Sequence, residues 1–167
     1  MLHGCTQDPA TFAAATLMNH AGPRHDFVVV YPGQDPRRNP QGCWNWFLPE
    51  HQQRDTGEPA AIAAIVADLI DTSSHCTIDP ERVFVAGLFA GGATAAILCA
   101  CYPDLFAAVA VHSGLAYRSA TSMGSACSTR DLRPRRRARP ELVAPPNRRW
   151  TSLHPVAMAS RTRGAHA

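Results

Sequence analysis

The ten residues Val83–Gly92, VFVAGLFAGG, constrain the fold of this chain more than any other stretch. A short apolar run enters a turn flanked by Gly87 and Gly91, and a segment of small residues leaves it. This layout is that of Gly-x-Ser-x-Gly, the nucleophile elbow, in which a sharp strand-to-helix turn raises a serine hydroxyl above a parallel sheet. The position between the glycines is occupied by Phe89. The stretch therefore predicts the geometry of an acyl-transfer site without its nucleophile.

Strand and helix patterns alternate along residues 1–117. Residues 1–5 read as the end of a strand, and we expect the strands before it to be missing from this reading frame. The continuous β-branched run at 27–31 is typical of a strand buried on both faces. Two further strands are expected at 82–86 and 106–111. Repeated strand-helix units imply a parallel sheet covered by helices, so the predicted fold class is α/β.

Three helices are expected between these strands. The first begins with Asp8 as N-cap and Pro9 at the first helical position, and should end near His20. The second begins at Glu58, and the third covers 90–102. Apolar residues in the second recur at helical spacing and should form one stripe that faces the sheet. The stripe consists of Ile62, Ile65, Val66, Leu69 and Ile70.

A long loop at 32–57 carries the aromatic cluster CWNWF at 43–47. Structured loops of this length are commonly functional or pass over a site. Two interpretations remain open for Trp44, Trp46 and Phe47: they grip an acyl chain or a polymer, or they only pack the loop.

The character of the chain changes after Tyr117. Residues 1–117 hold 5 arginines against 11 acidic side chains, whereas residues 118–167 hold 11 arginines against 2 acidic side chains. The second part shows no helical or strand periodicity, and we interpret 118–167 as a disordered Arg/Pro-rich basic tail. A shifted reading frame near residue 118 would produce such a tail.

Composition excludes several classes of function. We find no run of about 18 apolar residues, so no membrane span is predicted, and the first residues do not form a secretory signal peptide. The six cysteines lack the spacing of a zinc site, and neither a metal nor another cofactor is predicted. The basic run at 133–139 attracts phosphate without specificity, and no recognition fold accompanies it, so no specific nucleic-acid partner is expected.

Several separated motifs together resemble the polyhydroxybutyrate (PHB) depolymerase-type esterase family of the α/β-hydrolase superfamily. These are LHGCTQD at 2–8, CWNWF at 43–47, VAGLFAGG at 85–92, YPDLF at 102–106 and VHSG at 111–114. The resemblance covers about residues 1–117. It implies a partial α/β-hydrolase domain there, small ester or polyester substrates, and an extracellular location. Members of the family are typically secreted carboxylic-ester hydrolases with a Ser-Asp-His triad.

Carried over residue by residue, the resemblance places Phe89 at the nucleophile position. The backbone N–H of Ala90 would give one donor of the oxyanion hole, and Cys5, in the turn after Gly4, would give the second. Both donors belong to the main chain and do not depend on the side chain. A disulfide between Cys5 and Cys43 is one alternative for a secreted relative, and two free thiols are the other.

The triad partners are not recognisable. They should follow the nucleophile in chain order, yet Asp131 and His154 have no strand context and His166 lies near the chain end. Phenylalanine has no group that can attack a carbonyl. Ser113 reads as a turn serine, and His3 and His112 read as structural or supporting residues at strand ends.

Two functions follow from these observations. The first is an esterase-family domain whose activity is impaired or absent; serine and phenylalanine codons can differ by one base, so one change would create Phe89. The alternative is a non-catalytic module that binds an ester or polymer in a pocket derived from the elbow. The oligomeric state cannot be deduced from the sequence.

Overall fold

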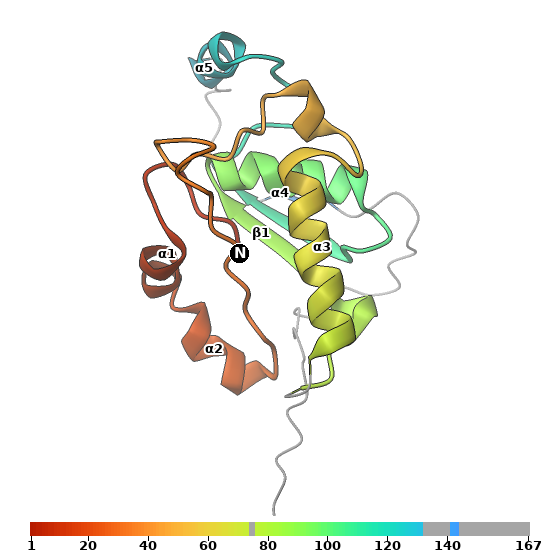
Figure 1. The fold of residues 1–167 in the computed structure, drawn as a ribbon. Coiled ribbons are helices and arrows are strands. Elements are labelled where there is room, and N and C mark those ends of the chain that lie inside the picture. The colour runs from red at the N-terminus through yellow and green to blue at the C-terminus, as the bar shows by residue number, and fades with distance from the viewer. Residues whose placement is uncertain (74–75, 132–140, 144–167) are drawn as a thin grey trace, which may run out of the picture.

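A three-stranded sheet forms the centre of the structure, a computed structural model that describes residues 1–73, 76–131 and 141–143 (Figure 1). Strand β1 (Phe84–Leu88) runs parallel to β2 (Ala108–His112), with Phe84 opposite Ala108 and Leu88 opposite His112. Strand β3 (Glu141–Val143) pairs antiparallel with β2. Leu2 adds a parallel bridge to Gly87 on the other side of β1. The predicted α/β class with a parallel sheet is confirmed.

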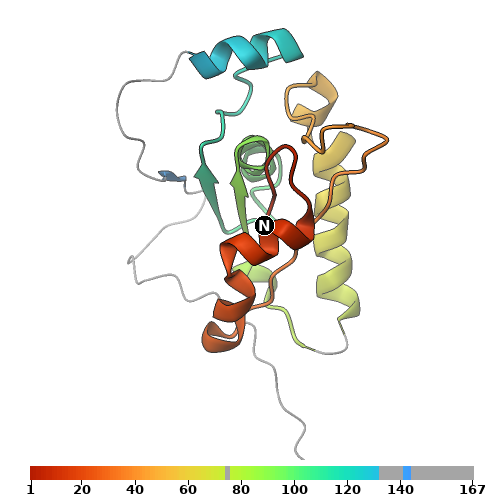
Figure 2. The same cartoon turned by 90° about the vertical axis from the view of Figure 1, so that its left-hand side faces the viewer.

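Two long helices cover this sheet. Helix α4 (Ala90–Cys101) leaves β1 and packs against both β1 and β2, and α3 (Gly57–Thr72) packs against α4 (Figures 1 and 2). The core lies between α4 and the strands, where α4 is rich in small residues that allow close approach to the sheet. Its most deeply buried side chains are Leu2, Ala95, Ile97, Leu98, Phe106 and Val109.

The first helical segment differs from the prediction. Asp8 caps α1 (Pro9–Thr16) in a capping box with Thr11, as expected for the start of the helix. The helix ends early because Leu17 adopts a left-handed conformation with φ 55° and donates its N–H to the carbonyl of Ala13. A second helix, α2 (Met18–His25), follows and includes Pro23. The expected single helix ending near His20 is therefore wrong.

The run 27–31 does not form the doubly buried strand that its composition predicts. The structure assigns it no strand, and Val28 is 48% exposed. The physical reason is that, among the residues that the structure describes, no strand lies where the backbone of this run could pair with it. The predicted stripe of α3 is likewise incompletely covered, since Ile62 is 4% exposed but Ile65 is 42% exposed.

Short elements complete the described chain. Two 3₁₀ turns cover Pro49–Gln52 and Pro80–Arg82. Helix α5 (Met123–Asp131) and strand β3 lie in 118–167, where we expected no regular element. Both elements are too short to give a clear periodicity in the sequence. The basic run at 133–139 lies outside the described residues, as does most of the predicted tail. Within the described part of the chain, no helix combines the length and apolarity that a membrane span needs.

Candidate active site

The turn between β1 and α4 has the predicted elbow geometry. Phe89 stands at its tip with φ 60° and ψ −115°, a conformation that is costly for a residue with a side chain. Two main-chain hydrogen bonds hold it: the N–H of Phe89 donates to the carbonyl of His112 at 2.9 Å, and the N–H of Ala93 donates to the carbonyl of Phe89 at 3.0 Å. The residue at position 89 is thus fixed by its backbone.

The flanking glycines are required by close packing. A Cβ atom on Gly87 would lie 2.1 Å from the carbonyl oxygen of Gly91, and one on Gly91 would lie 2.3 Å from the carbonyl oxygen of Leu2. Both neighbours are main-chain atoms and cannot rotate away. The glycines therefore let the first strand segment, β1 and α4 meet at the tip of the elbow.

A small pocket opens beside the elbow. Its volume is about 10 Å³, which is room for one water molecule. The lining residues come from the aromatic loop, the elbow and the turn after β2: Trp46, Phe89, Ala90, Ala93, Ser113 and Leu115. The side chain at position 89 is therefore half-buried at the wall of a site too small, in this state, for an acyl group.

The geometry is suited to two oxyanion donors. Ala90 is the first residue of α4, where backbone N–H groups have no partner within the helix. The turn at Gly4 lies directly against the elbow, since a Cβ on Gly4 would be 3.5 Å from the Cβ of Phe89. Cys5 follows in that turn, and within the described residues its N–H is assigned no hydrogen bond. Their role as donors stays a prediction.

A disulfide ties the Gly4 turn to the aromatic loop. Cys5 and Cys43 are joined, with an S–S distance of 1.98 Å and 4.2 Å between their Cα atoms. Next to Cys43, the indole N–H of Trp44 donates to the carbonyl of His3 at 3.0 Å. Trp44 is 3% exposed and does not line the small pocket, whereas Trp46 does. Of the two predicted substrate contacts, only Trp46 lies at the site in this structure.

His3 supports the same turn. Its ring is buried, Nδ1 lies 2.9 Å from the carbonyl oxygen of Gly4, and Nε2 accepts the backbone N–H of Gln34 at 3.3 Å. A carbonyl can only accept, so the proton sits on Nδ1. His3 therefore holds the turn in place and has no free nitrogen for proton transfer.

His112 and Ser113 lie at the end of β2, opposite the elbow. Both are exposed, and the hydroxyl of Ser113 is 3.1 Å from Nδ1 of His112. Ser113 has φ 54° and lines the small pocket beside Phe89. The pair is adjacent in sequence within a tight turn, which accounts for its contact without a catalytic role.

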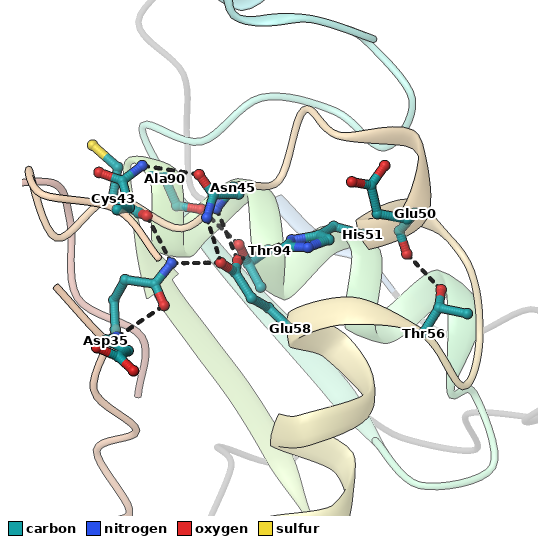
Figure 3. A network of polar contacts seen from close by, with 11 residues as sticks. Asp35, Cys43, Asn45, Glu50, His51, Thr56, Glu58, Ala90 and Thr94 are labelled. Carbon is teal, nitrogen blue, oxygen red and sulfur yellow. Dashed lines mark hydrogen bonds and ion pairs between the residues drawn. The ribbon is translucent and has the colours of Figure 1, made fainter. Parts of the chain in front are cut away.

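A buried polar network behind the site was not found from the sequence (Figure 3). Its centre is the carboxylate of Glu58 at the start of α3, which is 6% exposed. One oxygen accepts the side-chain amides of Gln34 at 2.5 Å and of Asn45 at 2.7 Å; the other accepts the backbone N–H of Asn45 at 2.8 Å and lies 3.3 Å from Nδ1 of His51. Burial acts to raise the pKa of Glu58, but the adjacent His51 ring and the hydrogen bonds from Gln34 and Asn45 hold this pKa below its ordinary value.

The network connects α3 with the Gly4 turn. Gln34 binds Glu58 through its side chain and His3 through its backbone, and its side chain also donates to the carbonyl of Cys43. The members are scattered over 25 residues of loop and helix, so no spacing rule marks them. The one available signal was an acidic residue beside a proline at a helix start.

The other predicted residues are not brought to the site. Asp131 is the last residue of α5 and does not follow a strand of the sheet. His154 and His166 lie outside the described residues. In the part of the chain that the structure describes, no cluster of three or more His, Cys, Asp or Glu side chains could hold a metal ion.

A glycine-flanked elbow between a parallel strand and a helix, with candidate oxyanion donors beside it, defines the α/β-hydrolase class of protein. Comparison with known proteins narrows this class. Residues 1–146 match the family model for esterase PHB depolymerases, beyond residue 117, where the resemblance was expected to stop. This chain belongs to that family.

Individual relatives support the same family assignment. Poly(3-hydroxyalkanoate) depolymerase C of Paucimonas lemoignei is 42% identical over 125 residues, which are 75% of this chain and 29% of that protein. Feruloyl esterase B of Neurospora crassa is 29% identical over 75% of this chain and 41% of that protein. Among solved structures, an acetyl xylan esterase from Aspergillus awamori superimposes with a TM-score of 0.62 and 28% identity, over 74% of this chain and 43% of that one. The chain thus spans less than half the length of these relatives.

Proposed function

We propose that this chain is a catalytically impaired member of its carboxylic-ester hydrolase family. The observation that carries the proposal is Phe89 at the tip of a well-formed elbow. Its benzyl side chain can neither attack a carbonyl nor be activated by a base. The backbone donors at Cys5 and Ala90 would still polarise an ester carbonyl, since they do not depend on the missing hydroxyl.

The expected loss is large. Removing the nucleophile of a serine hydrolase lowers kcat by about 10⁶-fold. Oxyanion donors and binding alone leave about 10³-fold acceleration over water. A carboxylic ester or a polyester is the substrate class that we infer, because relatives are named as a polyhydroxyalkanoate depolymerase and a feruloyl esterase. We also propose an extracellular location, which the Cys5–Cys43 disulfide supports.

The test is an esterase assay on a short p-nitrophenyl ester with the unmodified chain, Phe89→Ser and Phe89→Ala. We expect the unmodified chain and Phe89→Ala to show the same weak hydrolysis, no greater than the oxyanion donors and binding alone supply. Turnover by the unmodified chain above that of Phe89→Ala would overturn the proposed impairment. Rescue by Phe89→Ser would support the assignment of position 89 and show that a general base and acid are present.

A second candidate is a non-catalytic module that binds an ester or polymer. The specific observation in its favour is Trp46, which lines the pocket beside Phe89. Isothermal titration with short 3-hydroxybutyrate oligomers should then release heat, and Trp46→Ala should weaken binding. The absence of heat with folded protein would exclude this function for those ligands.

A further inference from the structure

The peptide unit between Gly4 and Cys5 carries the candidate second oxyanion donor, the N–H of Cys5. A trans peptide is planar, and its carbonyl oxygen and amide hydrogen point in opposite directions. The direction of the Cys5 N–H is therefore set by whatever holds the carbonyl of Gly4. Because Gly4 has no side chain, its backbone turns easily, and the orientation of this peptide unit has to be fixed by its neighbours.

The ring of His3 holds this carbonyl. Its Nδ1 lies 2.9 Å from the carbonyl oxygen of Gly4, and the residue is 1% exposed. Nδ1 can donate in only one of the two neutral tautomers of the ring, and the partner of the other nitrogen selects the tautomer. Here Nε2 accepts the backbone N–H of Gln34 at 3.3 Å, which leaves the proton on Nδ1.

The side chain of Gln34 is held at both ends of its amide group. The amide nitrogen donates to Glu58 at 2.5 Å and to the carbonyl of Cys43 at 2.9 Å (Figure 3). The amide oxygen accepts the backbone N–H of Asp35 at 3.0 Å. This last bond ties the side chain of Gln34 to the same stretch of backbone that presents its N–H to His3.

Glu58 anchors this series of contacts to a helix. It lies in the first turn of α3, is 6% exposed, and also accepts the backbone N–H of Asn45 at 2.8 Å. A carboxylate can only accept hydrogen bonds, so Glu58 fixes which end of the Gln34 amide faces it. Hydrogen bonds to an ionised acceptor are stronger than those between neutral groups. The direction of the Cys5 N–H thus depends on a carboxylate far away in the sequence.

We propose that Glu58 and Gln34 are positioning residues for the oxyanion hole: they act through the His3 ring to hold the N–H of Cys5 in the direction that a donor needs. The inference rests on the proposed function, which makes Cys5 a donor, and extends it to the residues that orient this donor. Loss of the Gln34 side chain lets the Gly4–Cys5 peptide turn. It weakens stabilisation of the transition state and leaves binding of the ester in the ground state unchanged.

The first test compares Gln34→Met with Gln52→Met in the full 167-residue chain labelled with ¹⁵N. The substitution is the same, but the Gln52 amide donates to the carbonyl of Ala120 at 2.8 Å, which takes no part in the contacts of His3. In Gln34→Met the order parameter of the Cys5 N–H should fall from about 0.85 to below about 0.6. Its residual dipolar coupling should also change. Gln52→Met should leave both values as they are in the unmodified chain.

A lower Tm of Gln34→Met with no change at the Cys5 amide would show a purely structural role and overturn the proposal. If Gln34→Met does not fold, Glu58→Gln replaces it and should lower the order parameter of Cys5 in the same way. The ¹⁵N spectrum of the unmodified chain gives an independent measurement. The neutral ring of His3 should carry its proton on Nδ1, and a proton on Nε2 would overturn the proposal, because the bond to Gly4 would then be missing.

The second test measures hydrolysis of a short p-nitrophenyl ester in the unmodified chain and in Phe89→Ser. Gln34→Met should lower the rate of hydrolysis about 10- to 100-fold in both, since loss of one oxyanion donor costs about 10²–10³ in kcat. In Phe89→Ser the loss should fall on kcat, with less than about a twofold change in KM. Gln52→Met should have no effect on the rate.

An equal loss of rate in the two methionine variants, or a loss confined to KM, would overturn the positioning role. Failure of the proposed function looks different. If neither the unmodified chain nor Phe89→Ser hydrolyses the ester above the rate in buffer, the oxyanion role of Cys5 fails. The order parameter of Cys5 then still decides whether Gln34 and Glu58 orient this amide.

Discussion

The two flanks of β1 are lined by similar, mostly apolar residues, but they differ in how completely they are packed. Toward β2 and the elbow, Gly87, Gly91 and Gly92 allow main-chain atoms to approach closely, and Ala95, Ile97 and Leu98 of α4 are fully buried. Toward 27–31, an equally apolar set of side chains lines an open groove. The difference shows that an apolar sequence allows a segment to pair as a strand, but pairing also requires a neighbouring strand.

The largest expected effect is at the elbow, on the packed flank. Gly91→Ala places a Cβ 2.3 Å from a main-chain oxygen that cannot move independently. We expect a loss of about 3 kcal/mol or more in the free energy of unfolding, measured by urea denaturation. Gly124→Ala in α5 is the control, because its nearest neighbour would be 4.0 Å away. An equal effect at both positions would contradict the description of the elbow.

Matched truncations on two helices compare the flanks directly. Leu98 of α4 is fully buried, and Leu98→Ala should cost about 2–5 kcal/mol. Leu69 of α3 is half-buried beside the groove, and Leu69→Ala should cost about 1 kcal/mol, because little packing is lost there. If the two truncations cost the same in chemical denaturation, the groove is closed in solution.

The polar network around Glu58 connects the packed flank to the loops. Its contribution to the free energy of unfolding should be smaller, and it can be measured as a function of pH. Glu58→Gln should cost about 2 kcal/mol at pH 7, because the buried carboxylate accepts three hydrogen bonds. The native pKa of Glu58 is held below its ordinary value of 4.5. Its contribution is therefore fully present above pH 4.5 and is lost as the pH falls through the lower native pKa.

The stability difference between the parent chain and Glu58→Gln should accordingly shrink in acid. Glu50→Gln is the control, since Glu50 is exposed in the 3₁₀ turn just before α3 and its substitution should change stability by less than about 0.5 kcal/mol. A difference that stays constant from pH 7 to pH 3 would show that the charge of Glu58 does not stabilise the native state.

Local patterns in the sequence predicted the elements that depend on local rules. The cap at Asp8, the glycines around Phe89 and the apolar strand at β2 could all be predicted, because the residues that determine each feature lie within a few positions of one another. The elbow also indicated the class of protein, which the family match confirms.

Features that depend on residues far apart in the sequence could not be predicted from local patterns. The run 27–31 has the composition of a central strand, but no residue within it reveals whether a neighbour pairs with it. Glu58 meets Gln34 and Asn45 only after the long loop has folded back onto α3. Leu17 breaks the first helix through its backbone conformation, which an apolar side chain does not signal.

The backbone of the elbow has an evolutionary consequence. The hydrogen bonds that hold residue 89 run through the main chain of His112 and Ala93, and the tight contacts around it belong to glycines. The turn has its unusual φ of 60° with phenylalanine at its tip. A change of the side chain at position 89 therefore does not require a change of the turn, so that the scaffold of the elbow and the chemistry at its tip can vary independently.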